Sequence, residues 1–249
     1  CLSAFLAQLH DLQRRRSDIN AKHARILLLR GYEIEKRHTG YYTIIMRWLD
    51  FLFPPRADET VLRDVSADEF LAKIAPRLIP ETRPGTVALL PFNDTAVRAA
   101  IHEAKYRGSE RAFRFLGSAL ADYLRDCDDV GHRKSYICIV PMPLGKERLR
   151  ERGFNQIEEV AKCAVQELKI KMETDLLVRI RETISQISLA REKREENMRG
   201  AFRATRRADP TYTYIIVDDV ITTGATLQAA IDALHEAGAE HIIPLALAH

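Results

Sequence analysis

Apolar residues from about position 86 onward follow two alternating spacings. Short uninterrupted apolar runs, typical of strands covered on both faces of a sheet, alternate with stretches in which apolar residues recur at i, i+3, i+4 and i+7, as on one face of a helix. This alternation predicts right-handed crossovers and a mostly parallel sheet flanked by helices, an α/β fold. The predicted strands are Thr86–Leu90, Tyr136–Val140, Asp175–Val178, Tyr214–Val217 and Ile242–Leu247.

Four amphipathic helices are predicted among these strands. Asp94 is a suitable N-cap for the first helix, and Gly238 is placed to end the fourth. Because proline cannot donate to a ladder, Pro244 inside the last predicted strand suggests an edge position for that strand. The apolar faces of the helices are formed by Val97, Ala100, Ile101 and Ala104; by Phe113, Leu116, Leu120 and Leu124; by Ile157, Val160, Ala161, Ala164 and Leu168; and by Leu227, Ala230, Ile231 and Leu234.

Two regions do not follow this alternation. Residues 180–207 contain seven arginines between two predicted strands and are longer than an ordinary connection, which is typical of a functional loop. Residues 1–45 have a helical pattern and hold the excess of positive charge, with eight Lys and Arg against four Asp and Glu. We therefore expect a helical N-terminal extension over 1–45 and a main domain over 46–249. The charge of the main domain is nearly balanced and is no indication of nucleic-acid binding.

The composition excludes several protein classes. A chain of 249 residues with 46% apolar and 29% charged residues has the proportions of a globular protein of one or two domains. Its four cysteines form no C-x-x-C pair, which argues against a zinc ribbon, a redox dithiol and a disulfide scaffold. The best candidate for a membrane span, Tyr41–Phe53, is interrupted by Arg47 and Asp50, and no signal-peptide pattern is found. We expect a cytoplasmic protein without a membrane span.

The segment Ile215–Leu227, with the sequence IIVDDVITTGATL, is the strongest candidate for chemistry. A buried strand brings two carboxylates, Asp218 and Asp219, to its carboxyl end, the edge where open α/β sheets bind ligands. Ionised Asp only accepts hydrogen bonds and so suits the vicinal hydroxyls of a ribose. The turn that follows directs N–H groups and hydroxyls to one point at the start of a helix, which suits a phosphate monoester. This turn consists of Thr222, Thr223, Gly224, Ala225 and Thr226.

A simpler explanation is that paired Asp before a Thr-Gly turn only ends a strand and caps a helix, since both residue types are ordinary caps. The complete pattern of an apolar run, Asp-Asp and T-T-G-x-T at fixed spacing favours a ligand site instead. Neither a Walker A loop nor a G-x-G-x-x-G fingerprint occurs in the chain, so the common nucleotide-binding alternatives are not supported.

This segment resembles the phosphoribosyl pyrophosphate (PRPP) motif of type I phosphoribosyltransferases, and four further motifs resemble the competence protein ComF family. Ile139–Lys162, IVPMPLGKERLRERGFNQIEEVAK, is similar to that family's V-P-x-P and R-L-R-x-R-G-F-N-Q signature. Gln186–Phe202 matches its Q-x-x-L-x-x-x-x-R-x-x-N-x-x-x-A-F spacing, and Ile101–Gly108, IHEAKYRG, resembles its I-x-x-x-K-Y-x-G element. With DFLFPPR at Asp50–Arg56, the resemblance extends from Met46 to the C-terminus.

The resemblance implies a type I phosphoribosyltransferase fold in which residues 180–207 form a mobile hood over the site. It implies that Asp218 and Asp219 hold the ribose hydroxyls and that Thr222–Thr226 hold the 5′-phosphate. The loop after the strand that ends at Val140 would contact pyrophosphate, with basic help from that loop and from the hood. The pyrophosphate candidates are Pro141, Met142, Pro143, Lys146 or nearby Arg148, and, from the hood, Arg181, Lys193 and Arg194.

Several of these residues have plainer interpretations that the sequence leaves open. Pro141 and Pro143 can simply end a strand, and a hood arginine can simply be solvated. Asn155 can be the N-cap of the following helix. Lys105 can lie over apolar core with its ammonium in water.

One element of the family is missing. Many ComF relatives carry a four-cysteine zinc module after the L-F-P-P element, whereas residues 57–100 contain no Cys or His, so we expect no structural zinc. The resemblance implies an enzyme that uses PRPP with Mg²⁺ carried on it, transfers or cleaves a phosphoribosyl group and releases pyrophosphate. PRPP or a nucleoside monophosphate is the expected ligand. The alternative is a non-catalytic PRPP- or nucleotide-binding accessory protein of the DNA-uptake machinery. The sequence does not identify the acceptor.

Overall fold

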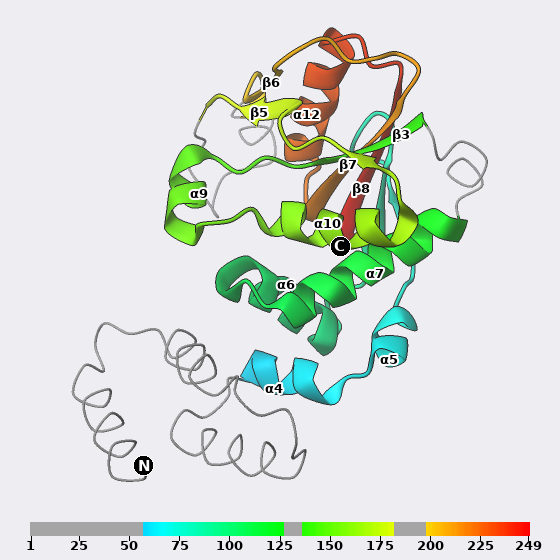
Figure 1. Cartoon of the computed structure of the whole chain (residues 1–249), viewed down its shortest axis with the longest axis vertical. Coiled ribbons are helices and arrows are strands. Elements are labelled where there is room, and N and C mark those ends of the chain that lie inside the picture. The colour runs from blue at the N-terminus through cyan, green and yellow to red at the C-terminus, as the bar shows by residue number, and fades with distance from the viewer. Residues whose placement is uncertain (1–56, 127–135, 182–197) are drawn as a thin grey trace, which may run out of the picture. The chain divides into compact units, whose positions relative to one another are not determined.

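The computed structural model describes residues 57–126, 136–181 and 198–249, which include a six-stranded sheet with the order β1-β2-β8-β7-β3-β4 (Figure 1). β1 pairs antiparallel with β2, and the other pairs are parallel. The mostly parallel sheet expected from the sequence is therefore confirmed. The strands are β1 Arg77–Ile79, β2 Thr86–Leu90, β3 Ile137–Pro141, β4 Lys171–Met172, β7 Thr213–Val220 and β8 His241–Ala248.

Helices cover both faces of this sheet. Ile215 and Val217 of β7 belong to one apolar core with the helices α6, α7 and α10, whereas Tyr214 and Ile216 belong to a second core with α12. Figure 1 shows α12 on one side of the strands and α6, α7 and α10 on the other. The helices are α4 Ala57–Asp64, α5 Ala67–Leu71, α6 Thr95–Arg107, α7 Glu110–Asp126, α9 Lys146–Arg152, α10 Gln156–Leu168 and α12 Ala225–Glu236.

The four predicted helices are confirmed, with their apolar faces buried. Asp94 caps α6, because its Oδ1 accepts hydrogen bonds from the N–H groups of Ala96 and Val97 at 2.8 and 3.1 Å. α7 and α10 pack very closely at Gly117, where an added Cβ would lie 2.4 Å from the Cβ of Cys163. A glycine in the middle of a helix costs stability on its own, so this position is explained by the close approach of the two helices.

Two strand predictions need correction. The run Asp175–Val178 does not join the main sheet: β5, Leu177–Arg179, pairs antiparallel with β6, Phe202–Ala204, in a separate two-stranded sheet. Pro244 does not mark an edge, because β8 lies between β2 and β7. Pairing with β2 begins at Leu245, after the proline, so the ladder on that side starts where an N–H is again present.

Other predictions fall outside the described residues. The helical extension over 1–45, the boundary at 46 and the central part of the hood, 182–197, all lie there and stay predictions. In the described part of the chain, no helix combines the length and apolar composition needed to cross a membrane.

Candidate functional site

β7 brings the acidic pair to the carboxyl edge of the sheet, between β3 and β8. Successive residues of a strand face opposite sides of the sheet. Asp218 therefore follows Ile216 toward the side of α12, and Asp219 follows Val217 toward the side of α6 and α10. The two carboxylates are adjacent in the chain but have different surroundings.

Asp219 is held by groups from two helices and from its own strand. Its Oδ2 accepts a hydrogen bond from Gln156 Nε2 at 3.1 Å and lies 3.3 Å from the Nζ of Lys105. Its Oδ1 accepts the N–H of Val220 at 2.7 Å. Lys105 belongs to the I-x-x-x-K-Y-x-G element and Gln156 belongs to the R-G-F-N-Q element. Residues of these two motifs therefore contact Asp219, which belongs to the PRPP-like motif. The alternative that Lys105 only covers apolar core is therefore wrong.

Desolvation acts strongly on Asp218. Burial and, after it, the neighbouring negative charge of Asp219 raise the pKa of this carboxyl from its usual 3.8 to about 7. The N–H of Asp219, which donates to Asp218 Oδ1 at 2.8 Å, and the positive charges of Lys105 and Arg179 lower the pKa. The effects of burial and like charge are larger, so Asp218 is harder to ionise than an exposed aspartate.

The predicted phosphate turn lies directly after β7 and begins α12. Gly224 is the N-cap residue, with a φ of 74°, and no side chain caps the helix. The first N–H groups of a helix have no partner within it, so an uncapped helix start has donors to offer an anion. The turn is anchored on one side, because the N–H of Ile221 donates to the carbonyl of Ala248 at 3.0 Å.

The structure explains why position 224 is a glycine, for a reason that the sequence did not show. A Cβ at this position would lie 2.8 Å from Cγ2 of Thr82, in the loop between β1 and β2. Thr82 is buried, and its hydroxyl is 2.7 Å both from the carbonyl of Pro84 and from the hydroxyl of Thr86. Positive φ and the contact with Thr82 both require glycine, whatever the turn binds. Close approach of a ligand to Gly224 stays a prediction.

The predicted pyrophosphate loop lies beside the acidic strand. Pro141 is the last residue of β3, which agrees with the simpler interpretation that this proline ends a strand. The N–H of Met142 donates to the carbonyl of Val217 at 2.8 Å. Asn155 Nδ2 donates to the carbonyl of Met142 at 3.0 Å, while its Oδ1 accepts the N–H of Ile157 at 3.1 Å. Asn155 is thus the N-cap of α10 and also holds the loop, which continues through half-buried Pro143.

The structure describes some of the basic residues that the sequence suggested for pyrophosphate, and their role stays a prediction. Lys146 is exposed at the start of α9, and in the described part of the chain no hydrogen bond or ion pair joins it to the acidic pair. Arg181 donates to the carbonyl of Arg199 at 3.1 Å, and Arg194 and Lys193 lie outside the described residues. Arg179 was missed, although its charge acts on Asp218. Its position at the end of a predicted strand was the available signal.

Arg152 and Tyr106 form a second layer behind Asp219. Arg152 Nη1 donates to Gln156 Oε1 at 2.9 Å, and its guanidinium carbon lies 5.4 Å from the centre of the Tyr106 ring. Lys105 Nζ lies 5.9 Å from the same ring. Both residues belong to the ComF-like motifs, and sequence reasoning assigned them no role.

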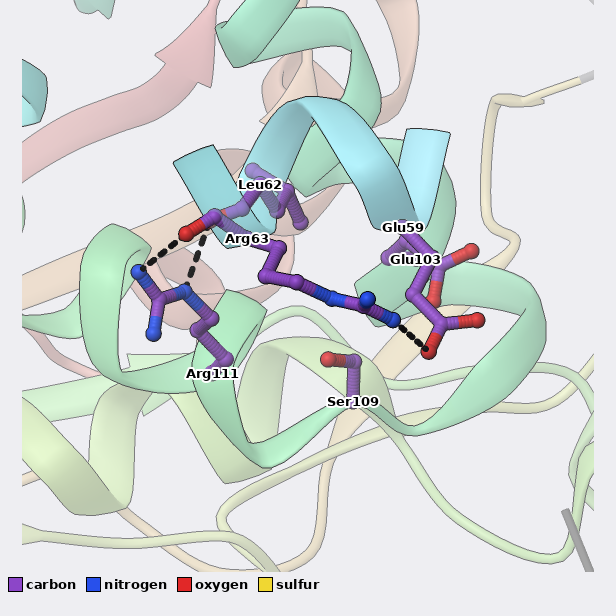
Figure 2. Close-up of a pocket in the computed structure, with 6 residues that line it drawn as sticks. All are labelled: Glu59, Leu62, Arg63, Glu103, Ser109 and Arg111. Carbon is purple, nitrogen blue, oxygen red and sulfur yellow. Dashed lines mark hydrogen bonds and ion pairs between the residues drawn. The ribbon is translucent and has the colours of Figure 1, made fainter. Parts of the chain in front are cut away.

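A cavity of about 190 Å³ lies elsewhere, between α4, α6 and α7 (Figure 2). Arg111 donates from Nε to the carbonyl of Leu62 at 2.7 Å and from Nη2 to the carbonyls of Arg63 and Val65 at 3.3 and 2.8 Å. Arg63 also forms an ion pair with Glu59 at 3.6 Å. Arg111 thus provides hydrogen-bond donors for backbone carbonyls at the end of α4. These contacts stabilise the fold, and the residues that line the cavity do not include Asp218 or Asp219.

Comparison with known proteins agrees with the motifs. The family described as phosphoribosyl transferase domain matches residues 165–249. The chain is 29% identical over 144 residues to competence protein F of Haemophilus influenzae, covering 57% of this chain and 63% of that protein. It is 28% identical over 149 residues to competence protein ComFC of Bacillus subtilis, covering 59% and 56%. It is 34% identical over 89 residues to the DNA utilization protein YhgH of Escherichia coli, covering 36% and 39%.

The chain thus matches less than two thirds of the length of each of these relatives. A solved glutamine PRPP amidotransferase from B. subtilis, complexed with ADP and GMP, has 18% sequence identity and a TM-score of 0.37, covering 59% of this chain and 30% of that one. The matched phosphoribosyl transferase domain includes the acidic strand and the turn that begins α12, and the relatives are competence proteins. The chain is thus similar to ComF competence proteins over part of its length, and its residues 165–249 match the phosphoribosyl transferase domain.

Proposed function

We propose that this protein binds PRPP at the carboxyl edge of β7 and transfers or cleaves its phosphoribosyl group with release of pyrophosphate. The observation that carries the proposal is the direct succession of two carboxylates, Asp218 and Asp219, and an uncapped helix start at Gly224. Hydroxyl groups need acceptors and a 5′-phosphate needs donors. The carboxylates supply the acceptors and the helix start supplies the donors. They follow one another in the chain as the hydroxyls and the phosphate follow one another in ribose 5-phosphate.

The third part of the ligand would lie at the loop that begins with Met142. Hydrogen bonds from Met142 to β7 and from Asn155 to Met142 hold this loop beside the acidic strand. In the reaction, the bond between the anomeric carbon and the pyrophosphate oxygen breaks, and a bond to the acceptor forms. Positive charge grows on the sugar and negative charge on the leaving group, so catalysis would rest on positioning and electrostatics.

Mg²⁺ would arrive with the PRPP. A Mg²⁺ ion prefers about six oxygen ligands, and Asp219 is already engaged by Lys105 and Gln156. Among the described residues, no three His, Cys, Asp or Glu side chains lie together as a metal site. The engagement of Asp219 supports a cation held by the pyrophosphate and sugar oxygens, where it would neutralise charge on the leaving group.

A second candidate function is a non-catalytic PRPP- or nucleotide-binding role in DNA uptake. It is favoured by the names of the relatives, which are competence and DNA utilization proteins. A fold does not dictate catalysis, and a binding module would keep the ribose and phosphate contacts without turnover.

One experiment separates these functions. Purified protein is incubated with PRPP and Mg²⁺ and with a panel of bases and amines, and pyrophosphate release is followed over time. Binding is measured in parallel by calorimetry, with the double variant Asp218→Asn, Asp219→Asn as control. Time-dependent release that the control lacks supports the enzyme. Saturable binding without release supports the accessory role, and absence of both contradicts the proposal.

A further inference from the structure

Asp218 and Asp219 differ in how many of their acceptor positions are already occupied by groups of the protein. An ionised carboxylate offers about four acceptor positions. Asp219 accepts hydrogen bonds from Gln156 and from the N–H of Val220, and it also forms an ion pair with Lys105. Among the described residues, Asp218 has a single hydrogen bond, from the N–H of Asp219. Most of the remaining acceptor capacity of the pair therefore belongs to Asp218.

The groups around Asp219 are themselves held in place. Gln156 Oε1 accepts from Arg152 at 2.9 Å, which fixes the orientation of the amide so that Nε2 donates to Asp219. Gln156 is only 4% exposed and cannot turn to solvent. Tyr106 lies beside both Arg152 and Lys105. Two helices thereby present one amide donor and one ammonium to a single oxygen, Asp219 Oδ2.

We propose that Lys105 and Gln156 are positioning residues: they hold and neutralise Asp219, so that Asp218 is the main acceptor for the ribose hydroxyls. This inference rests on the proposed function and deepens it. The two carboxylates of the motif then do different work. Asp219 is the anchored residue that joins β7 to α6 and α10, and Asp218 meets the ligand on the opposite side of the strand.

The charge of Lys105 also matters for the state of Asp218. Among the residues that the structure describes, the charged groups that act on Asp218 are Asp219 on the same strand, Lys105 on α6 and Arg179 on β5. Removal of Lys105 leaves the negative charge of Asp219 uncompensated, which makes ionisation of Asp218 harder. A ligand that needs an ionised Asp218 will then bind less well at neutral pH, and the loss will shrink in alkaline solution.

The test compares wild type with Lys105→Met, Lys105→Arg and Lys73→Met by calorimetric titration with ribose 5-phosphate and with inorganic phosphate. Lys73→Met is the matched control: its side chain is 28% exposed, as is that of Lys105, and it pairs with Asp94, the N-cap residue of the same helix. Loss of Lys73 therefore loosens α6 without touching the acidic pair. In parallel, carbon NMR of the Asp carboxyls follows the titration of Asp218 in the unliganded proteins.

We expect Lys105→Met to bind ribose 5-phosphate about tenfold more weakly than wild type near pH 7. This is the loss expected if the pKa of Asp218 rises by about one unit. The loss should be smaller near pH 9, and Lys105→Arg should recover most of the affinity. Binding of inorganic phosphate, which has no hydroxyl pair, should be unchanged. The titration midpoint of Asp218 should rise in Lys105→Met alone.

The inference is overturned if Lys105→Met binds ribose 5-phosphate as wild type does, or if Lys73→Met loses as much affinity. The inference is also overturned if the affinity of Lys105→Met for inorganic phosphate falls as much as its affinity for ribose 5-phosphate. Should wild type bind no ribose 5-phosphate, the proposed function fails by itself. The carboxyl titration then decides the inference: a raised midpoint for Asp218 in Lys105→Met supports the role of Lys105, and an unchanged midpoint refutes it.

Discussion

Asn155 donates from Nδ2 to the carbonyl of Met142 at 3.0 Å, and this bond joins the start of α10 to the loop after β3. The same side chain caps α10 through Ile157. Two substitutions separate these roles. Asn155→Ser keeps a capping oxygen but cannot reach Met142, whereas Asn155→Ala loses both interactions.

Both variants should be less stable to urea than wild type, because the carbonyl of buried Met142 loses its donor, at a cost of about 1–3 kcal/mol. Asn155→Ala should lose about 1 kcal/mol more than Asn155→Ser, which is the worth of the cap. Calorimetry should show weaker pyrophosphate binding for both. Equal stability of the two variants would contradict the capping role, and unchanged pyrophosphate affinity would contradict the role of the loop.

Gly224→Ala should destabilise the protein in the absence of any ligand. A residue with a Cβ is strained at a φ of 74°, by roughly 1–2 kcal/mol, and the new Cβ would also meet Cγ2 of Thr82. Thr82→Ser removes that methyl group and keeps the hydroxyl. In a double-mutant cycle measured by urea unfolding, Thr82→Ser should restore part of the loss, and the remainder is the cost of positive φ. Strictly additive effects would show that the contact is unimportant.

Asp218→Asn should stabilise the unliganded protein in alkaline solution. The folded-state pKa of Asp218 is raised to about 7, so folding favours its protonated form, and this contribution to stability is lost as pH rises through that pKa. An amide carries no charge to desolvate. The melting temperature of the variant should exceed that of wild type by several degrees near pH 8.5, since 1 kcal/mol corresponds to about 2–4 °C for a domain of this size.

The gain of Asp218→Asn should shrink toward pH 4, where the carboxyl is neutral when folded. Asp64→Asn, at the exposed C-terminal end of α4, serves as the control and should show no comparable gain. A gain for Asp218→Asn that is the same at every pH would mean that charge burial is not its cause.

Gly117→Ala should reduce stability, although alanine is the better helix former by about 1 kcal/mol. The new Cβ would lie 2.4 Å from the Cβ of Cys163 and 2.9 Å from the carbonyl oxygen of Val160, and a backbone oxygen cannot move aside cheaply. Overpacking of this kind costs about 1–3 kcal/mol. Ser118→Ala, one residue further along α7, is the control and should have little effect on urea unfolding. A stable Gly117→Ala variant would show that α7 and α10 can separate.

Local patterns predicted much of the fold because they depend on neighbours in the sequence. The apolar runs at Thr86–Leu90 and Tyr214–Val217 are strands of the main sheet, and Asp94 and Asn155 cap α6 and α10. The acidic pair and the Thr-Gly turn could be recognised as a ligand motif for the same reason, since the strand, the turn and the helix start are contiguous.

Sequence spacing alone did not decide which residues meet across the fold. The proline rule placed β8 at an edge, whereas the structure has it between β2 and β7, because pairing with β2 begins only after Pro244. The charges of Lys105 and Arg179 both act on Asp218, and sequence reasoning assigned neither of them to this carboxylate.

The sequence by itself determined the helices α6, α7, α10 and α12, the strands β2, β3, β7 and β8, the order of the carboxylates and the family that the motifs resemble. Only the tertiary structure decided that Lys105 and Gln156 converge on Asp219 and leave Asp218 in a different environment. The physical reason is that a periodic pattern shows which face of a helix or strand is buried, but not which distant element covers it. Crossovers place α6 and α10 on one face of the sheet, and strand alternation turns Asp219 toward them.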